Sequence, residues 1–239
     1  MKEKILHEIE TGTFHLSYSR ISRFVKSPAH FLNYLEKKSE PTKAMQLGTA
    51  LHEVLFSEIK SFVIGDFDRR KKEDKEMAEM IESEGKFIIK IDEYEILKYQ
   101  VEICKNLLNE HDLLMNIVQT ETRQETEIGG YKFVFIPDAE TDNSVIELKR
   151  TADANPEKFR WEIINRSYDI QAAVYIHGTR KQNYFLLAVD DTAASLFCLT
   201  PQTLNSGMEK ILKGIGAFNA WVATGMNQMN YNSNEIIML

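Results

Sequence analysis

The chain has 239 residues, 43% of them hydrophobic and 27% charged, which is close to the composition of ordinary globular domains and favours a folded chain over an intrinsically disordered one. No apolar run approaches the ~20 residues that a membrane-spanning helix needs. The net charge of −7 disfavours a protein that coats nucleic acid, but it still allows an enzyme that binds DNA in one local channel.

The amino terminus and the two cysteines predict a cytoplasmic protein with no membrane partner. The N-terminal stretch Met-Lys-Glu-Lys-Ile-Leu-His-Glu lacks the apolar core of a signal peptide. Cys104 and Cys198 lie far apart and match no metal-ligand spacing, so we expect buried, reduced thiols. They are also too few for a four-cysteine iron–sulfur cluster, and we expect none.

Two short helices are predicted near the start of the chain. Ser17 or Ser19 is a suitable N-cap for a helix that continues to about residue 26. Ser27-Pro28 ends this helix, because the residue before a proline disfavours helical geometry, and a second helix follows over 29–35.

Apolar spacing predicts two longer helices in the next part of the chain. One is a buried helix over 45–57, opened by Gly48-Thr49, and the other runs over 92–118 with a break near His111. The charge run at 69–75 between them is typical of a solvated loop or helix face.

The pattern then changes to that of a β-sheet. Three strands are predicted, over 124–128, 131–136 and 144–148, as a three-stranded meander. Gly129-Gly130 and Asp142-Asn143 link them, and the Gly-Gly pair is a hairpin signal because both positions tolerate positive φ.

The remaining sequence alternates helices with strands. Helices are predicted over 156–165 and 169–179, a strand pair over 184–189 and 194–199, and a final helix over 201–224. The Asn-rich tail from Met226 onward permits no assignment. This order predicts an α/β core with an N-terminal helical layer.

We expect a single domain, 1–239, because neither a repeat nor a Pro/Gly-rich linker interrupts the chain. Its parts are a helical N-terminal segment over about 1–118, a catalytic core over about 119–224 and a tail over 225–239.

Three residues in the predicted meander carry the chemistry. Asp138 follows a proline that ends strand pairing, so it lies at a sheet edge. Alternate side chains of a strand share one face, so Glu147 and Lys149 point together while Leu148 points into the core. If the two strands are neighbours in a hairpin, Asp138 comes close to Glu147.

Two converging carboxylates form an oxygen-rich site that suits Mg²⁺ or Mn²⁺, and the carbonyl of Leu148 can serve as a further ligand. A lysine beside the metal can orient or deprotonate the attacking water and stabilise charge on a phosphate. Taken alone, Glu-x-Lys on a strand is equally typical of a surface ion pair worth under ~1 kcal/mol, and Pro-Asp of a turn. Geometry therefore leaves nuclease and ordinary surface open.

Several motifs resemble those of a known group of enzymes. Pro137-Asp138, Glu147-Leu148-Lys149 and Gln171-Ala172-Ala173-Val174-Tyr175 resemble the motifs of the PD-(D/E)xK nuclease superfamily. The resemblance is closer to RecB-type and RecE-type (exodeoxyribonuclease VIII-like) phage and prophage exonucleases. Further matches occur in the family order at Leu16-Ser17-Tyr18-Ser19 with Ser27-Pro28-Ala29-His30-Phe31, Gly48-Thr49-Ala50-Leu51-His52 and Ser167-Tyr168-Asp169-Ile170-Gln171.

The resemblance implies a restriction-endonuclease-like core, in which a central mixed β-sheet is flanked by helices. It implies that Asp138 and Glu147 bind the metal and that His52 is an additional ligand, although a core histidine is the ordinary alternative. Lys149 would act on the water. Gln171 and Tyr175, four residues apart on one helical face, would look into the cleft.

Two acidic residues are reserve candidates. Glu127 resembles an acidic position that some members place near the metal, and an ordinary surface strand glutamate is the alternative. Asp142 lies in the short acidic hairpin 139–144, where it could replace a neighbouring carboxylate as ligand. Position 147 carries Glu where many RecE-like members have Asp, a change that the superfamily pattern tolerates.

Candidate DNA contacts fall into two groups, and each is more often a plain surface residue. A helix start bearing Ser17, Ser19 and Arg20 could bind a terminal phosphate. Arg150 and Arg160 could contact the DNA backbone, and Trp161, like Tyr168, could stack on an unpaired base.

The resemblance implies a Mg²⁺-dependent deoxyribonuclease, with Mn²⁺ able to substitute, that degrades one strand of double-stranded DNA from an end for recombination by strand annealing. It also implies a separate single-strand annealing protein as partner and a ring-shaped homo-oligomer, which would let a chain of net charge −7 turn its basic surface inward. The alternatives are a structure-specific or single-strand endonuclease on the same fold and a catalytically inactive DNA-binding member.

Overall fold

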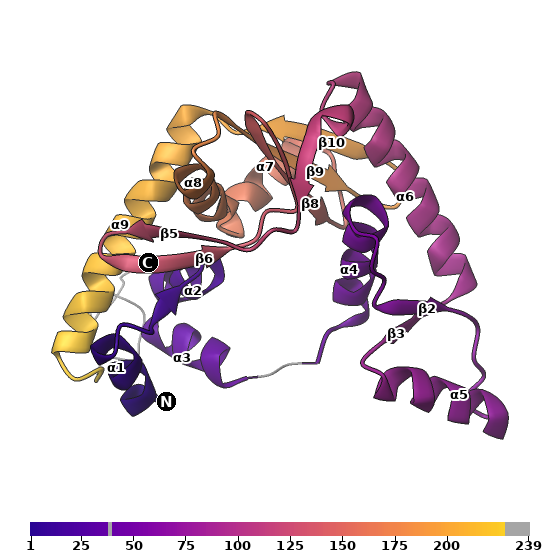
Figure 1. Cartoon of the computed structure of the whole chain (residues 1–239), viewed down its shortest axis with the longest axis horizontal. Helices are drawn as coiled ribbons and strands as arrows, with labels where there is room; N and C mark the ends of the chain where they lie inside the picture. The colour runs from indigo at the N-terminus through magenta and orange to yellow at the C-terminus, as the bar shows by residue number, and fades with distance from the viewer. Residues whose placement is uncertain (38–39, 228–239) are drawn as a thin grey trace, which may run out of the picture.

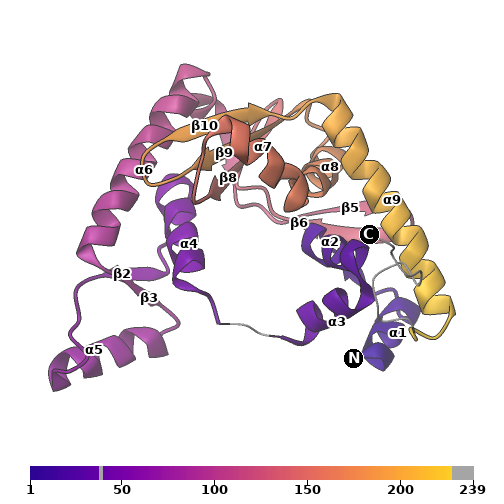
Figure 2. The ribbon, with the colours of Figure 1, turned by 180° about the vertical axis from the view of Figure 1, so that it is seen from behind.

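The computed structural model describes residues 1–37 and 40–227. Its ribbon forms an arch, with the main β-sheet at the top and two limbs below it (Figures 1 and 2). The first limb contains the two ends of the described chain and the second contains the segment between about residues 43 and 110. No helix within the described residues is long and apolar enough to cross a membrane.

The central sheet has five strands in the order β10-β9-β8-β7-β4. Strands β8 and β9 are parallel and the other neighbours are antiparallel, so the predicted mixed sheet is confirmed. Its strands are β4 (Ile117–Thr120), β7 (Ala139–Thr141), β8 (Ser144–Arg150), β9 (Asn183–Val189) and β10 (Ala194–Cys198).

Strand β8 lies in the middle of this sheet and separates two hydrophobic cores. Val145 belongs to the core on one face, whereas Ile146 and Leu148 belong to the core on the other. The alternation follows from the two-residue period of a strand. It brings Glu147 and Lys149 to the same face as Val145.

A second, three-stranded sheet has the order β1-β6-β5 and consists of β1 (His15–Leu16), β5 (Gln124–Ile128) and β6 (Tyr131–Phe135). Gly129 and Gly130 form the tight turn between β5 and β6, and their φ angles of +59° and +81° are those that favour glycine. The predicted Gly-Gly hairpin is therefore confirmed.

Helix α8 (Tyr168–Thr179) connects the two sheets, because it contacts β8 and β9 of one and β5 and β6 of the other. All residues from Asp169 to Tyr175 are buried, as expected for a helix that is covered on every side. Gly178 allows this packing, since a Cβ there would lie 2.3 Å from the Phe135 ring.

Outside the second limb, the remaining helices begin and end near the predicted positions, except α1 at the N-terminus, which lies in a stretch with no predicted helix. Ser17 caps α2 and Ser27 caps α3, each by accepting a backbone N–H three residues on. Helix α9 packs along α2 and α8. The helices are α1 (Lys2–Glu10), α2 (Tyr18–Lys26), α3 (Pro28–Glu36), α7 (Pro156–Asn165) and α9 (Pro201–Ala223).

The second limb contains strands that we did not expect. Between its helices, two short parallel strands pair with each other, and the charge run opens a helix rather than a loop. The helical description of residues 1–118 is thus incomplete. The elements are α4 (Lys43–Phe56), β2 (Phe62–Ile64), α5 (Lys72–Ser83), β3 (Phe87–Ile89) and α6 (Ile91–Glu110).

The predicted three-stranded meander is wrong. Strands β5 and β6 lie in the smaller sheet, and the partner of β8 is β7, which lies in the stretch 139–144 that the sequence predicts as a short hairpin connection. Strand β7 escaped notice because it is short and carries Glu140, whose buried carboxylate accepts hydrogen bonds from Gln119 and Gln124. The predicted break near His111 is confirmed, because α6 ends at Glu110, but the continuation to residue 118 is only a short 3-10 turn (Leu114–Asn116) that leads into β4.

The expectation of two buried thiols holds for Cys104 and is wrong for Cys198, which is exposed at the end of edge strand β10. Burial raises the pKa of the Cys104 thiol to about 12. The tail beyond residue 227 lies outside the described residues.

Native protein is expected to react rapidly with Ellman's reagent at Cys198 alone, because Cys104 is inaccessible and almost fully protonated at neutral pH. Both thiols should react in guanidinium chloride. The control Cys198→Ser should remove the fast phase, and a fast phase that persists in this variant would contradict the packing of α6.

Candidate active site

The Asp138 carboxylate stands where the pairing of β7 with β8 ends. The last paired residues are Ala139 and Ile146, and Pro137 has no N–H with which to extend the ladder. The side chain of Asp138 supplies the next hydrogen bond to β8 in place of the backbone: its Oδ2 accepts the backbone N–H of Leu148 at 2.7 Å. One more step of the same register sets Asp138 opposite Glu147.

Helix α4 contributes a histidine to the same carboxylate. His52 Nδ1 lies 3.2 Å from Asp138 Oδ1, so Asp138 joins the second limb of the arch to the central sheet. Burial lowers the pKa of His52, but the charge and hydrogen bond of Asp138 outweigh it and leave this pKa above its ordinary value.

Glu147 and Lys149 form a buried ion pair on one face of β8, as the alternation predicted. Lys149 Nζ lies 2.6 Å from Glu147 Oε1, and the Glu147 residue is only 3% exposed. Burial and the charge of Asp138 raise the pKa of the Glu147 carboxyl. Burial lowers the pKa of Lys149, but the two carboxylates raise it above its ordinary value, so the lysine is a stable ammonium group.

Helix α8 supplies a second donor to Glu147. Gln171 Nε2 lies 2.5 Å from Glu147 Oε1 and 3.1 Å from the Tyr175 hydroxyl, which in turn donates to the Ile136 carbonyl at 3.3 Å. Gln171 and Tyr175 therefore do share one helical face turned toward the carboxylates. The chain of bonds leads from β8 through α8 to the residue before Pro137.

Two buried oxygens at this site have no hydrogen-bond partner among the described residues: Glu147 Oε2 and Gln171 Oε1. A buried carboxylate oxygen without a donor is costly unless a cation or water satisfies it. By donor type, the carboxylates of Asp138 and Glu147, the His52 imidazole and the Leu148 carbonyl suit a divalent cation. Within residues 1–37 and 40–227, no group of three His, Cys, Asp or Glu side chains converges as a preformed metal site.

Two adjoining cavities of 940 and 820 Å³ open beside these groups, and both are lined by Met45, Gly48, His52 and Lys149. The first extends toward Arg150 and Arg166, and the second toward Tyr18 and Tyr168. We refer to the two together as the cleft. Tyr18 was missed as a candidate; its place directly after the capping Ser17 was the available signal.

The predicted DNA contacts are not gathered at the cleft. Arg160 and Trp161 are exposed on α7, with Trp161 68% exposed, and neither lines the cleft. Arg150 lines it but lies 2.6 Å from Asp191. Arg20 donates to the His15 carbonyl at 2.5 Å and so ties α2 to β1. These contacts are structural, and the DNA-binding roles stay predictions.

The other candidates lie elsewhere. Ser17 Oγ accepts the backbone N–H of Arg20 as the cap of α2, and the Ser19 carbonyl accepts the Ser22 hydroxyl. The Glu127 carbonyl contacts His177 on α8. Asp142 lies in the turn between β7 and β8, where its backbone carbonyl accepts a hydrogen bond from Lys181 Nζ.

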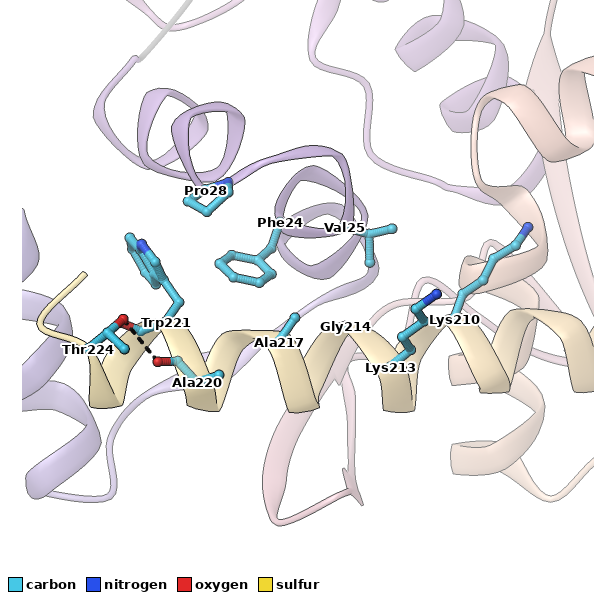
Figure 3. Close-up of a pocket in the computed structure, with 10 residues that line it drawn as sticks. All are labelled: Phe24, Val25, Pro28, Lys210, Lys213, Gly214, Ala217, Ala220, Trp221 and Thr224. Carbon is cyan, nitrogen blue, oxygen red and sulfur yellow. Dashed lines mark hydrogen bonds between the residues drawn. The ribbon is translucent and has the colours of Figure 1, made fainter. Parts of the chain in front are cut away.

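A separate cavity of 650 Å³ lies between α2, α3 and α9. Phe24 and Trp221 face it, and Lys210 and Lys213 lie toward one end (Figure 3). None of the residues that line this cavity is acidic, so it has no carboxylate for metal or acid–base chemistry. The cleft lined by His52 and Lys149 is therefore the candidate active site.

Comparison with protein families assigns the chain. A family model described as a PDDEXK-like domain of unknown function (DUF3799) matches residues 17–215. The chain belongs to this family. Membership confirms the resemblance to the PD-(D/E)xK superfamily and the restriction-endonuclease-like fold, and the PDDEXK-like fold supports a nuclease. No curated protein sequence matches the chain.

Solved structures of similar fold include a protein from Eubacterium rectale provisionally described as an exonuclease, with a TM-score of 0.63 at 14% identity over 96% of this chain and 91% of that one. A phage-related exonuclease from Haemophilus somnus has a TM-score of 0.43 at 12% identity, covering 90% and 98%. An alkaline exonuclease from Laribacter hongkongensis has a TM-score of 0.34 at 15% identity, covering 73% and 96%. The last two scores are too low to carry an argument.

Tyr175→Phe is expected to lower the free energy of unfolding by about 1–2 kcal/mol, because it removes a buried hydroxyl that links Gln171 to the Ile136 carbonyl. Urea denaturation measures the change. The matched control is Tyr99→Phe, whose exposed hydroxyl also binds one carbonyl, that of Thr192, and which should change stability by less than about 0.5 kcal/mol. Equal effects of the two substitutions would contradict the network.

Proposed function

We propose that the chain is a Mg²⁺-dependent deoxyribonuclease that degrades one strand of double-stranded DNA from an end. The observation that carries the proposal is the buried Glu147 carboxylate, which has one unsatisfied oxygen and is paired with the Lys149 ammonium, a group that lines the cleft. Membership of a PDDEXK-like family supports it. Mn²⁺ is expected to substitute for Mg²⁺, since both prefer oxygen ligands.

The chain's own groups have separate tasks in phosphodiester hydrolysis. Asp138, Glu147 and the Leu148 carbonyl would hold the cation, with His52 beside Asp138 as a further ligand. When bound, the cation would lower the pKa of a coordinated water and polarise the phosphate. Lys149 would orient the water and stabilise charge on the phosphate. Gln171, held by Tyr175, keeps Glu147 in place.

The finer parts of the proposal concern the biological setting. An exonuclease that leaves single-stranded overhangs serves recombination by strand annealing. A single-strand annealing protein would be the partner that binds these overhangs. A cytoplasmic ring of several copies would enclose the DNA and turn the basic residues inward. A structure-specific or single-strand endonuclease on the same fold is the alternative.

Digestion of end-labelled linear duplex in Mg²⁺ is expected, with closed circular duplex left intact and no cleavage in EDTA. Gel analysis of each labelled strand separately measures the rate and shows which strand is degraded. Cutting of closed circles would favour the endonuclease, and undiminished cleavage in EDTA would remove the metal mechanism.

Lys149→Ala should reduce the cleavage rate by about 100-fold or more, because it removes a preorganised cation beside the reacting phosphate. A circular dichroism spectrum like that of the wild type shows that the variant is folded. Lys72→Ala, which removes an exposed lysine of α5 that does not line the cleft, is the matched control and should cleave at the wild-type rate. Equal and negligible activity of wild type and Lys149→Ala would indicate an inactive DNA-binding member.

Saturating Mg²⁺ or Mn²⁺ should raise the melting temperature of the wild type by about 5–10 °C, because the cation binds only the folded chain. Asp138→Asn and Glu147→Gln should abolish this shift. Asp142→Asn changes an exposed acid in the same hairpin and should keep it. A shift lost in Asp142→Asn and kept in Asp138→Asn would reassign the ligand.

A further inference from the structure

A glycine stands in the middle of helix α4 without a packing reason. Gly48 is in the second turn of a fourteen-residue helix, where glycine is the weakest helix former apart from proline. A Cβ built on it meets no atom within 4 Å. An alanine would thus fit the folded chain and favour the helix.

At three other glycines in the described helices, tight packing explains the absence of a side chain. A Cβ would lie 2.3 Å from Phe135 at Gly178, 2.1 Å from the Asp169 carbonyl oxygen at Gly207, and 2.8 Å from Val25 at Gly214. In each case a neighbouring element occupies the space. Gly216 on α9 resembles Gly48 in having open space, but it is exposed and does not line the cleft.

The open space above Gly48 is the cleft itself. Gly48 lines both of the adjoining cavities, and Ala44 and His52, one helical turn before and after it, line the first as well. The row formed by Ala44 and Gly48 therefore carries little side-chain bulk before His52, which contacts Asp138, while Met45 borders it on the same helix. Glycine is the residue that lets a ligand approach a protein backbone closely.

Away from Gly48, the cleft is lined by bulky aromatic side chains. Tyr18 from α2 and Tyr168 from the start of α8 line the second cavity, and α2 and α4 stand on different limbs of the arch (Figures 1 and 2). Lys149 Nζ lies 5.2 Å from the centre of the Tyr168 ring, so this ring lies beside the Lys149 ammonium group. Aromatic rings accept stacked bases without regard to sequence.

We propose that Gly48 is a positioning residue: the DNA strand crosses α4 in contact with its bare backbone at Gly48, and the base next to the cut lies toward Tyr18 and Tyr168. The inference rests on the proposed nuclease function and adds the path of the strand. A methyl group at position 48 fills the contact and moves the phosphate away from Lys149 and Asp138. A displacement of about 1 Å at a reacting centre reduces rate by about 100-fold.

Gly48→Ala tests the proposal, with Gly216→Ala as the matched control. Both substitutions replace a helical glycine that has open space above it, so both should raise the melting temperature by about 1–4 °C. Gly48→Ala should lower kcat/KM on linear duplex by about 10- to 100-fold, whereas Gly216→Ala stays within about twofold of wild type. A loss of activity together with a gain of stability separates positioning from folding.

Two outcomes would overturn the proposal. One is an active wild type whose rate of cleavage is matched by Gly48→Ala. The other is a Gly48→Ala protein that melts below wild type, because the glycine would then serve folding.

Binding of a short fluorescein-labelled single strand in EDTA keeps the proposal independent of catalysis. Gly48→Ala should bind this strand at least about threefold more weakly than Gly216→Ala. This difference should hold even if the wild type shows no cleavage in any divalent metal. Such a lack of cleavage would refute only the proposed nuclease function. Equal binding by the two variants, or no binding by the wild type, would refute the path over Gly48.

Discussion

Burial of a carboxylate within a central β-strand is the constraint on which the rest of the site depends. Glu147 occupies the position in β8 between two core residues, Ile146 and Leu148, and its side chain leaves the strand on the opposite face. Removing such a charge from water costs several kcal/mol unless partners compensate it. The Lys149 ammonium and the Gln171 amide compensate one of its oxygens and leave the other without a partner among the described residues.

Helix α8 is the element that makes this burial possible. It is covered on both sides by the two sheets, so Gln171 and Tyr175 have no freedom to turn toward solvent. Rigid placement matters because hydrolysis depends on groups that are already oriented when charge develops on the phosphate. Close contacts at Gly178 and Gly207 fix α8 against Phe135 and α9 and thereby fix the amide against Glu147.

The arch brings the second limb to the same point. His52 reaches Asp138 from α4, and Asp138 caps the Leu148 N–H, so one carboxylate joins the limb to the sheet. The basic residues near the cleft are largely neutralised by local partners, as Arg150 is by Asp191. The excess of acid over base in the chain, with 36 Asp and Glu against 29 Lys and Arg, therefore does not conflict with a small site that holds one lysine.

Local rules of the chain were sufficient for the helix break at Ser27-Pro28, the Gly129-Gly130 hairpin and the shared face of Glu147 and Lys149, because each depends on residues close in sequence. They also narrowed the cap of α2 to Ser17 or Ser19, of which Ser17 is the cap. Only tertiary structure decided that β7 rather than β6 pairs with β8, since a three-residue strand with a buried glutamate has no local signature. It also decided that Gln171 contacts Glu147 and that Arg150 is paired with Asp191. Those contacts join residues far apart in the chain, and their free energy exists only when the sheets and α8 have packed.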